Sequence, residues 1–136
     1  MQLCLIKNPD CSRKLAYDIA RIVYAHTGAT SLRVIEAMTS MISNASKKTG
    51  REISDIISDS EIFSALRSDS KYHTRMSVPA NCRAFQTCLR TAWRMLHNNL
   101  PDMCFGATCF HYADEIPTWA TSRGYILDTD GLLFYI

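Results

Sequence analysis

A change in hydrophobic period near Pro101 constrains this chain more than any other feature. Before Pro101, apolar residues recur at intervals of three and four, the spacing of one face of an α-helix. After it, residues 107–112 alternate, so that every second side chain lies on the same face of an extended strand. Helices first and strands last predict an α+β fold, in which an N-terminal helical part packs on a small C-terminal antiparallel sheet with a groove between them.

Two helices are predicted in the first fifty residues. The first runs from Ser12 to about His26, with Asp10 or Ser12 able to accept from its first amide hydrogens. The second begins after the N-cap residue Ser31 and ends before Gly50. Each helix carries an apolar stripe for the core: Leu15, Ile19, Ile22 and Val23 in the first, and Leu32, Ile35, Met38 and Ile42 in the second.

The elements that follow are shorter. Residues 52–67 hold two apolar clusters that predict one or two short helices, and the polar residues 68–79 predict a loop. Asn81 then caps a third long helix, which ends at Asn98 and Pro101. Its apolar stripe consists of Phe85, Leu89, Ala92 and Leu96.

The C-terminus is predicted to be a β-hairpin. Residues 125–127 and 132–135 are apolar and flank the turn formers of residues 128–131. Gly131 occupies the position in this turn where a positive φ is expected. Together with the strand over residues 107–112, the hairpin supplies the antiparallel sheet of the predicted fold.

Length and charge limit the possible functions. The chain has 136 residues, 47% of them hydrophobic, and no repeat or low-complexity stretch marks a second unit. Residues 1–136 are therefore predicted to form one domain. Fifteen Lys and Arg residues stand against thirteen Asp and Glu residues, and no segment concentrates either sign, which argues against a nucleic-acid partner.

Export and redox signals are sparse. No run of about 18 apolar residues could form a transmembrane helix, and the opening MQLCLIKNPD lacks the basic and apolar regions of a signal peptide. We therefore expect no membrane-spanning segment and no export signal in this sequence. Six cysteines without a Cys-x-x-Cys pair are too few for a disulfide scaffold and leave the redox compartment open.

Three ordered blocks in the C-terminal third carry a family resemblance. Residues 106–111 (GATCFH) are followed by 116–120 (IPTWA) and 131–135 (GLLFY). They resemble the signature of the SleB-type cell-wall hydrolases, the family of the spore-cortex-lytic enzymes: Gly-Ala with an aromatic residue and His or Asn, then Pro-x-Trp, then Gly-x-x-Phe-Tyr. Upstream segments resemble the family's opening helix pair and the block around its Gln-Phe motif. The resemblance covers roughly residues 12–136.

This resemblance implies an activity and a partner. Members of the family act on bacterial peptidoglycan, and several are described as lytic transglycosylases, which cut between N-acetylmuramic acid and N-acetylglucosamine. For this chain it implies a lysozyme-like or transglycosylase-like groove for peptidoglycan glycan strands, no cofactor, and a location in the periplasm or cell wall. A catalytically degenerate member would use the same groove to bind glycan or a protein partner without cleavage.

The chain departs from the family pattern at the catalytic position. The family has Tyr-x-Glu after its first helix, with Glu as the catalytic acid, whereas this chain has Tyr24-Ala25-His26. Glycan cleavage needs a carboxylic acid whose pKa is raised by an apolar pocket. His26 as a direct replacement therefore competes with a histidine that merely interacts with the negative end of the helix dipole. Glu36 is the next candidate acid, although its helix position favours a solvated side chain, and Glu115 follows it.

Six residues are predicted to contact the glycan. Trp119 and Tyr125 offer aromatic faces on which sugar rings can stack. The other four lie in or beside segments that resemble the family. The six are Tyr24, Asn44, Thr108, His111, Trp119 and Tyr125.

Cysteine and histidine suggest two alternatives of another kind. Cys109 and His111 share a strand face, and with Cys104 they provide three residues of zinc-ligand type or the beginnings of a Cys–His hydrolase. The pattern supplies neither a fourth ligand nor an orienting Asp or Asn, so no metal site is predicted. A helical structural domain unrelated to glycans would require the three C-terminal blocks to be coincidental.

Overall fold

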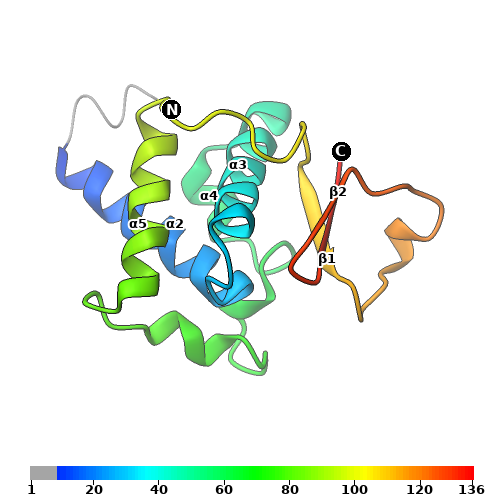
Figure 1. The fold of residues 1–136 in the computed structure, drawn as a ribbon, viewed down its shortest axis with the longest axis horizontal. Coiled ribbons are helices and arrows are strands. Elements are labelled where there is room, and N and C mark those ends of the chain that lie inside the picture. The colour runs from blue at the N-terminus through cyan, green and yellow to red at the C-terminus, as the bar shows by residue number, and fades with distance from the viewer. Residues whose placement is uncertain (1–8) are drawn as a thin grey trace.

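The computed structural model describes residues 9–136 and confirms the α+β fold. Within these residues, four helices form the N-terminal body and three short strands lie at the other end of the long axis (Figure 1). The helices are α2 (Pro9–Thr27), α3 (Leu32–Thr49), α4 (Ile53–Ile57) and α5 (Arg83–Leu96); the strands are β1 (Cys109–Tyr112), β2 (Leu127–Thr129) and β3 (Leu132–Tyr135); and the 3-10 helices are η1 (Ser64–Leu66), η2 (His73–Ser77) and η3 (Thr118–Ala120).

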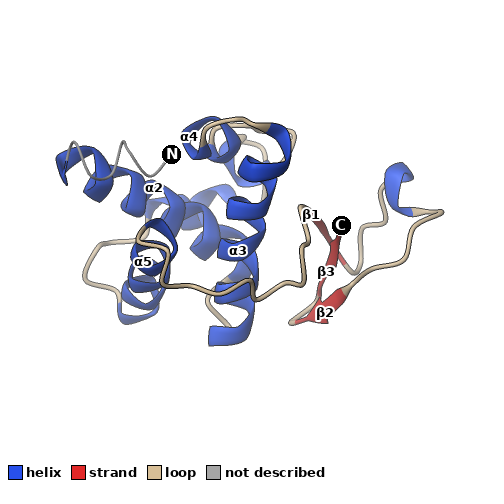
Figure 2. Cartoon of the chain, turned by 90° about the horizontal axis from the view of Figure 1, so that it is seen from above, coloured by secondary structure: helices blue, strands red, loops and turns tan. Residues whose placement is uncertain are grey.

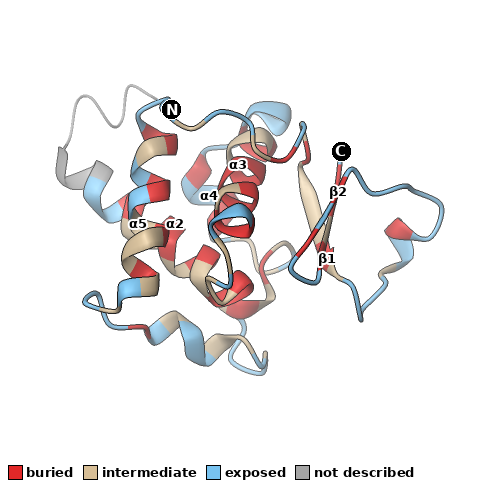
Figure 3. Cartoon of the chain, viewed as in Figure 1, coloured by how far each residue is buried: buried red, intermediate tan, exposed pale blue. Residues whose placement is uncertain are grey.

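The core of the helical body lies where α2, α3 and α5 face one another (Figure 3). The predicted stripe of α2 is confirmed throughout, since all four of its residues are buried. In α3 the stripe is confirmed at Ile35, Met38 and Ile42 but wrong at Leu32, which opens the helix beside a loop and is 53% exposed. Within residues 9–136, none of the helices combines the length and apolar character that a bilayer crossing requires.

The predicted ends of α3 are confirmed. The Ser31 side chain accepts a hydrogen bond from the backbone N–H of Val34 at 3.2 Å and so satisfies one of the free donors of the first turn. At the other end, Gly50 adopts a left-handed conformation with φ 74° and donates its N–H to the carbonyl oxygen of Ser46. A residue with a Cβ would be strained at this position.

The predicted caps of the other two long helices are wrong. α2 already includes Asp10 and Ser12, so neither is its N-cap, and their side chains lie outside the described residues. α5 begins at Arg83, which moves its N-cap from Asn81 to Cys82, and Cys82 makes no capping hydrogen bond through its side chain. The pattern of apolar residues thus located the helices better than the capping residues did.

The segment between α3 and α5 is compact but mostly irregular. The short helices predicted over residues 52–67 are confirmed by α4 and η1. Residues 68–79, predicted to be a loop, contain the single-turn helix η2. η2 packs against both α2 and η1, so this segment belongs to the folded body.

The sheet has the strand order β1-β3-β2, and both pairings are antiparallel. The hairpin is confirmed: Thr129 pairs with Leu132 across a two-residue turn in which Asp130 (φ 54°) and Gly131 (φ 79°) both have positive φ. Such a turn matches the twist of the flanking strands. The prediction placed the strands slightly too early, because β2 begins only at Leu127 and β1 only at Cys109.

The sheet joins the helical body through one face of β1. The Phe110 ring lies 5.9 Å from the Phe63 ring, between centroids, and Tyr112 makes hydrogen bonds to His26 in the last turn of α2. A view from above shows the three strands beside α3, with the connection that carries η3 extending beyond them (Figure 2). The joint between helices and sheet therefore lies next to the end of α2.

Candidate functional site

A cleft of about 480 Å³ lies at the joint between the helical body and the sheet. The helical side contributes the end of α2 and the segment around η1, and the sheet side contributes β1 and the connection leading to η3. The lining residues are His26, Glu61, Ile62, Ser64 and Arg67 on the helical side, and Phe110, His111, Tyr112, Glu115, Ile116, Pro117 and Trp119 on the sheet side.

The cleft continues beyond η1. A second hollow of about 430 Å³ shares Ser64, Arg67 and Glu115 with the cleft and extends along residues 69–72. The two hollows therefore adjoin, and their walls mix charged, hydroxyl and aromatic side chains. Their polar walls differ from the mostly apolar lining of pockets that enclose compact ligands.

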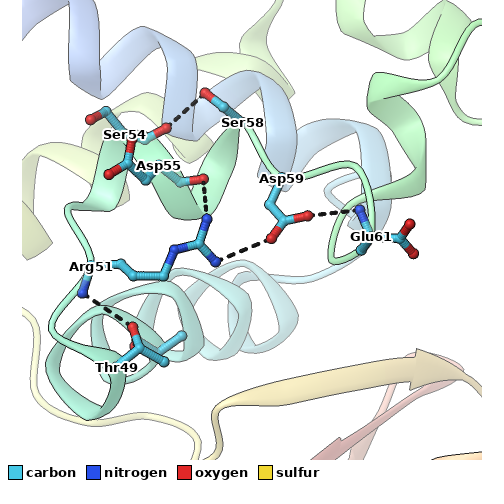
Figure 4. A network of polar contacts seen from close by, with 8 residues as sticks. Thr49, Arg51, Ser54, Asp55, Ser58, Asp59 and Glu61 are labelled. Atoms are coloured by element: carbon cyan, nitrogen blue, oxygen red, sulfur yellow. Dashed lines mark hydrogen bonds and ion pairs between the residues drawn. The ribbon is translucent and has the colours of Figure 1, made fainter.

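The wall that carries Glu61 is held by a polar network after α4 (Figure 4). Arg51 donates from Nη1 to the Asp59 carboxylate at 3.1 Å and from Nη2 to the carbonyl oxygen of Asp55 at 3.3 Å. Asp59 also accepts from the backbone N–H of Glu61 at 2.9 Å. The Glu61 N–H and then the Arg51 side chain lower the pKa of Asp59, so the network persists at neutral pH. The turn is fixed while the Glu61 side chain stays exposed.

His26 lies in the floor of the cleft and is 2% exposed. Its Nε2 accepts from the backbone N–H of Ala65 at 3.3 Å, so this nitrogen carries no proton. Its Nδ1 lies 2.6 Å from the Tyr112 hydroxyl oxygen, and that hydroxyl donates its own hydrogen to the carbonyl oxygen of His26 at 3.0 Å. All three contacts are satisfied by a single tautomer, protonated at Nδ1.

Aromatic rings surround the imidazole of His26. The centroids of Phe63, Phe110 and Tyr72 lie 5.4, 5.5 and 5.7 Å from it. Burial, followed by the positive charge of Arg75, lowers the pKa of His26 from 6.5 to about 4. The imidazole is therefore neutral at pH 7, and in the structure it is a buried hydrogen-bonding side chain at the end of α2.

The floor ties three distant segments together. The Ala65 peptide in η1 donates to His26 and accepts from Nδ1 of His73 at 2.7 Å. The Tyr112 ring from β1 stacks on Tyr72 with centroids 4.6 Å apart and planes 10° apart. Burial raises the pKa of Tyr112, so its hydroxyl keeps the hydrogen that it donates to His26.

The sheet-side wall is a second ordered cluster. His111 Nδ1 donates to the carbonyl oxygen of Tyr112 at 2.7 Å, and its Nε2 accepts from the Tyr135 hydroxyl at 2.8 Å. The Trp119 ring meets His111 and Tyr135 at near-perpendicular angles, with centroids 5.7 and 5.1 Å away, and the Arg123 guanidinium lies 5.3 Å from it. Trp119 is held in place and is still 40% exposed.

Glu36 lies elsewhere. It projects from α3 toward α5, where its Oε2 accepts from Arg94 Nη1 at 2.8 Å. Its side chain is 12% exposed, so the prediction of a solvated side chain is wrong. Glu36 is not among the residues that line the cleft, whereas Glu61 and Glu115 both line it with exposed side chains.

The structure thus brings four of the predicted residues together: His26, His111, Trp119 and the candidate acid Glu115. Asn44 donates to Asp102 at 3.2 Å and to the carbonyl oxygen of Ala107 at 3.1 Å, and so holds the loop that enters β1. The other predicted glycan contacts outside the lining are Tyr24, Thr108 and Tyr125. Contact with glycan stays a prediction for all six.

The cysteines near β1 have structural surroundings. Burial raises the pKa of the Cys104 thiol to about 12, and Asn44 Nδ2 lies 3.4 Å from its sulfur. The Cys109 thiol is 3.7 Å from the carbonyl oxygen of Tyr135. Among residues 9–136, no three His, Cys, Asp or Glu side chains come close enough together to hold a metal ion.

Sequence reasoning missed Glu61, Arg67 and Tyr112 as parts of the cleft. Tyr112 directly follows the block GATCFH, so its position was a usable signal. Glu61 and Arg67 lie in an irregular segment whose path no periodicity reveals. Comparison of the chain with models of known protein families, with curated proteins and with solved structures finds no match.

Proposed function

We propose that this protein binds peptidoglycan glycan strands along the cleft and does not cleave them. The proposal takes its ligand from the resemblance to the SleB-type cell-wall hydrolases, and the state of His26 carries it. His26 stands at the position of the family's acid, yet it is a buried neutral imidazole with both ring nitrogens already in hydrogen bonds. Because peptidoglycan lies outside the cytoplasmic membrane, this function requires an extracytoplasmic location.

His26 is not placed to give a proton to a glycosidic oxygen. Cleavage requires a general acid that is protonated at working pH and within hydrogen-bond reach of the leaving oxygen. Nε2 of His26 is an acceptor, and the hydrogen on Nδ1 points to Tyr112 in the protein interior. A pKa of about 4 leaves far less than one percent of the imidazole charged at pH 7. Direct replacement of the catalytic Glu by His26 is therefore not part of the proposal.

The rim of the cleft provides for binding. Trp119 presents a fixed, partly exposed ring, which suits the apolar C–H face of a sugar. Arg67, Glu61 and Glu115 are exposed and can donate to or accept from hydroxyl and acetamido groups. Because the second hollow adjoins the cleft at Arg67 and extends toward Tyr72, more than one sugar of a strand can lie along the two.

A lytic transglycosylase with a relocated acid is the second candidate function. Transglycosylation needs one carboxylic acid, because the 6-hydroxyl of muramic acid closes on the anomeric carbon after the leaving oxygen is protonated. The observation in its favour is that Glu61 and Glu115 both line the cleft. Against it, both carboxylates are exposed, whereas a carboxyl that stays protonated near neutral pH needs apolar surroundings.

Co-sedimentation with purified peptidoglycan sacculi, followed by mass analysis of the released muropeptides, tests the two functions together. We expect wild-type protein to pellet with the sacculi and to release no 1,6-anhydro products. Glu61→Gln and Glu115→Gln should likewise release no 1,6-anhydro products. Glu36→Gln is the control, because it removes a carboxylate outside the cleft. Anhydro products that disappear in one of the first two variants would establish the transglycosylase, and failure to pellet would reject glycan binding.

A further inference from the structure

A separate hollow is lined by residues of α2 and α5. Both helices lie on the side of the helical body away from the sheet (Figure 1). It measures about 450 Å³ and is bounded by residues from these two helices alone. We call it the α2/α5 groove. Its floor consists of Ala16, Tyr17, Leu89 and Trp93, and its rim consists of Arg13, Arg90 and Arg94.

The floor of the α2/α5 groove leaves apolar surface in water. Trp93 is 40% exposed, and Tyr17 and Leu89 are only partly buried although they pack against the core. The floor belongs to two helices that pack against each other. An apolar groove of this kind is the surface on which amphipathic helices dock in helix-in-groove complexes.

The rim of the groove is cationic. Arg13 and Arg90 are exposed, and Arg21, one turn beyond the groove on α2, lies over the rings of Tyr17 and Phe85. Among the side chains that the structure describes, Asp18 and Glu36 are the acidic ones near this face, and each has a partner: Asp18 pairs with Lys14, and Glu36 pairs with Arg94. The face therefore keeps a positive excess beside its apolar floor.

We propose that the α2/α5 groove docks an amphipathic helix of a partner protein, which places apolar side chains between α2 and α5 and carboxylates against Arg13 and Arg90. Charge complementarity selects this occupant. A second copy of the chain docked through the same face would oppose arginines with arginines, which disfavours a symmetric dimer. The proposal does not depend on glycan binding, since the groove and the cleft share no lining residue.

A designed peptide pair provides the probe. One fluorescent 18-residue peptide carries leucines at helical spacing with glutamates beside them, and its partner has every glutamate replaced by lysine. We expect the acidic peptide to bind at least about tenfold more tightly in fluorescence anisotropy, and less tightly as salt rises. Equal affinity for the two peptides, or preference for the lysine peptide, would overturn the proposal.

Variants locate the binding. Arg13→Glu with Arg90→Glu should weaken the acidic peptide at least about tenfold, and Trp93→Ala should do so independently by removing the apolar anchor. Lys47→Glu with Lys48→Glu, two exposed residues at the end of α3, makes the same change in net charge and should leave affinity unchanged. An equal loss in this control pair would overturn the assignment to the groove.

The same variants also test two other possible ligands of the α2/α5 groove, a membrane surface and a second copy of the chain. If the protein binds phosphatidylglycerol vesicles but not the acidic peptide, and Trp93→Ala abolishes the vesicle binding, then the groove binds a membrane surface and the proposal is rejected. A dimer in sedimentation that Trp93→Ala dissociates would reject it in favour of self-association. Sacculus binding measured on the same variants separates this proposal from the proposed function, since all of them should still pellet with peptidoglycan.

Discussion

The floor and the rim of the cleft use polar residues in opposite ways. In the floor, His26 is 2% exposed, and its contacts with Ala65 and Tyr112 link α2, η1 and β1. On the rim, Trp119 is 40% exposed and Glu115 is open to solvent. Among the described residues, no buried side-chain nitrogen or oxygen lacks a hydrogen-bond partner. The comparison teaches that His26 holds elements of the fold together, and that under the proposed function the ligand contacts have to come from the rim.

The strongest test of this division is His26→Ala. Truncation leaves the buried N–H of Ala65 without its acceptor and opens a cavity among Phe63, Phe110 and Tyr72. We expect the free energy of unfolding to fall by about 3 kcal/mol. Urea denaturation at pH 7, followed by circular dichroism, measures this loss. A change below about 1 kcal/mol would mean that the floor is not a structural centre.

The second test uses pH. The pKa of His26 is about 4 in the folded protein, against an ordinary value of 6.5 that applies to the unfolded chain. Between pH 4 and pH 6.5 the unfolded chain therefore binds a proton at His26 that the folded protein does not bind. The stabilisation is complete above pH 6.5 and is lost as pH falls toward 4. For this residue alone, we expect unfolding to become easier by about 2 kcal/mol between pH 7 and pH 4.5.

His26→Gln is the control for the pH test. Its amide does not titrate, so this variant should lose most of the pH dependence across the same interval, whatever its stability at pH 7. Parallel urea titrations at the two pH values give the comparison directly. A variant that keeps the full slope would show that other groups are responsible for it.

The smallest effect on stability is expected at the rim. Trp119→Ala removes a ring that is 40% exposed, so the free energy of unfolding should fall by only about 1 kcal/mol. Affinity for sacculi should nevertheless drop about tenfold or more, because an aromatic anchor is lost. Pelleting assays at graded protein concentration measure this drop. Unchanged affinity would mean that Trp119 does not contact the glycan, and the assignment of ligand contacts to the rim would lose its main support.

Much of the fold was predictable because helix ends and tight turns depend on residues that are close together in the sequence. Ser31 and Gly50 bound α3 as expected, and the two-residue turn at Asp130 and Gly131 requires backbone conformations that this residue pair adopts readily. The prediction failed where the outcome depends on distant neighbours. Leu32 fits the apolar stripe of α3 by its position, yet it is exposed, because helical spacing does not reveal where the packing partner ends.

The candidate site was less predictable because its contacts are long-range. The partners of His26 lie 39 and 86 residues away, at Ala65 and Tyr112, and neither distance leaves a trace in local periodicity. Glu36 shows the same limit, since its partner Arg94 is 58 residues distant. His111 and Trp119 were found because they lie within short blocks that resemble a family.

The strand order also bears on how this protein is made. β3 lies between β1 and β2 but follows both in the chain, so it is the last of the three to leave the ribosome. Until residues 132–135 emerge, β1 has no hydrogen-bonding partner, and its backbone is open to other nascent chains. The sheet side of the cleft therefore becomes ordered only once β3 has paired with β1.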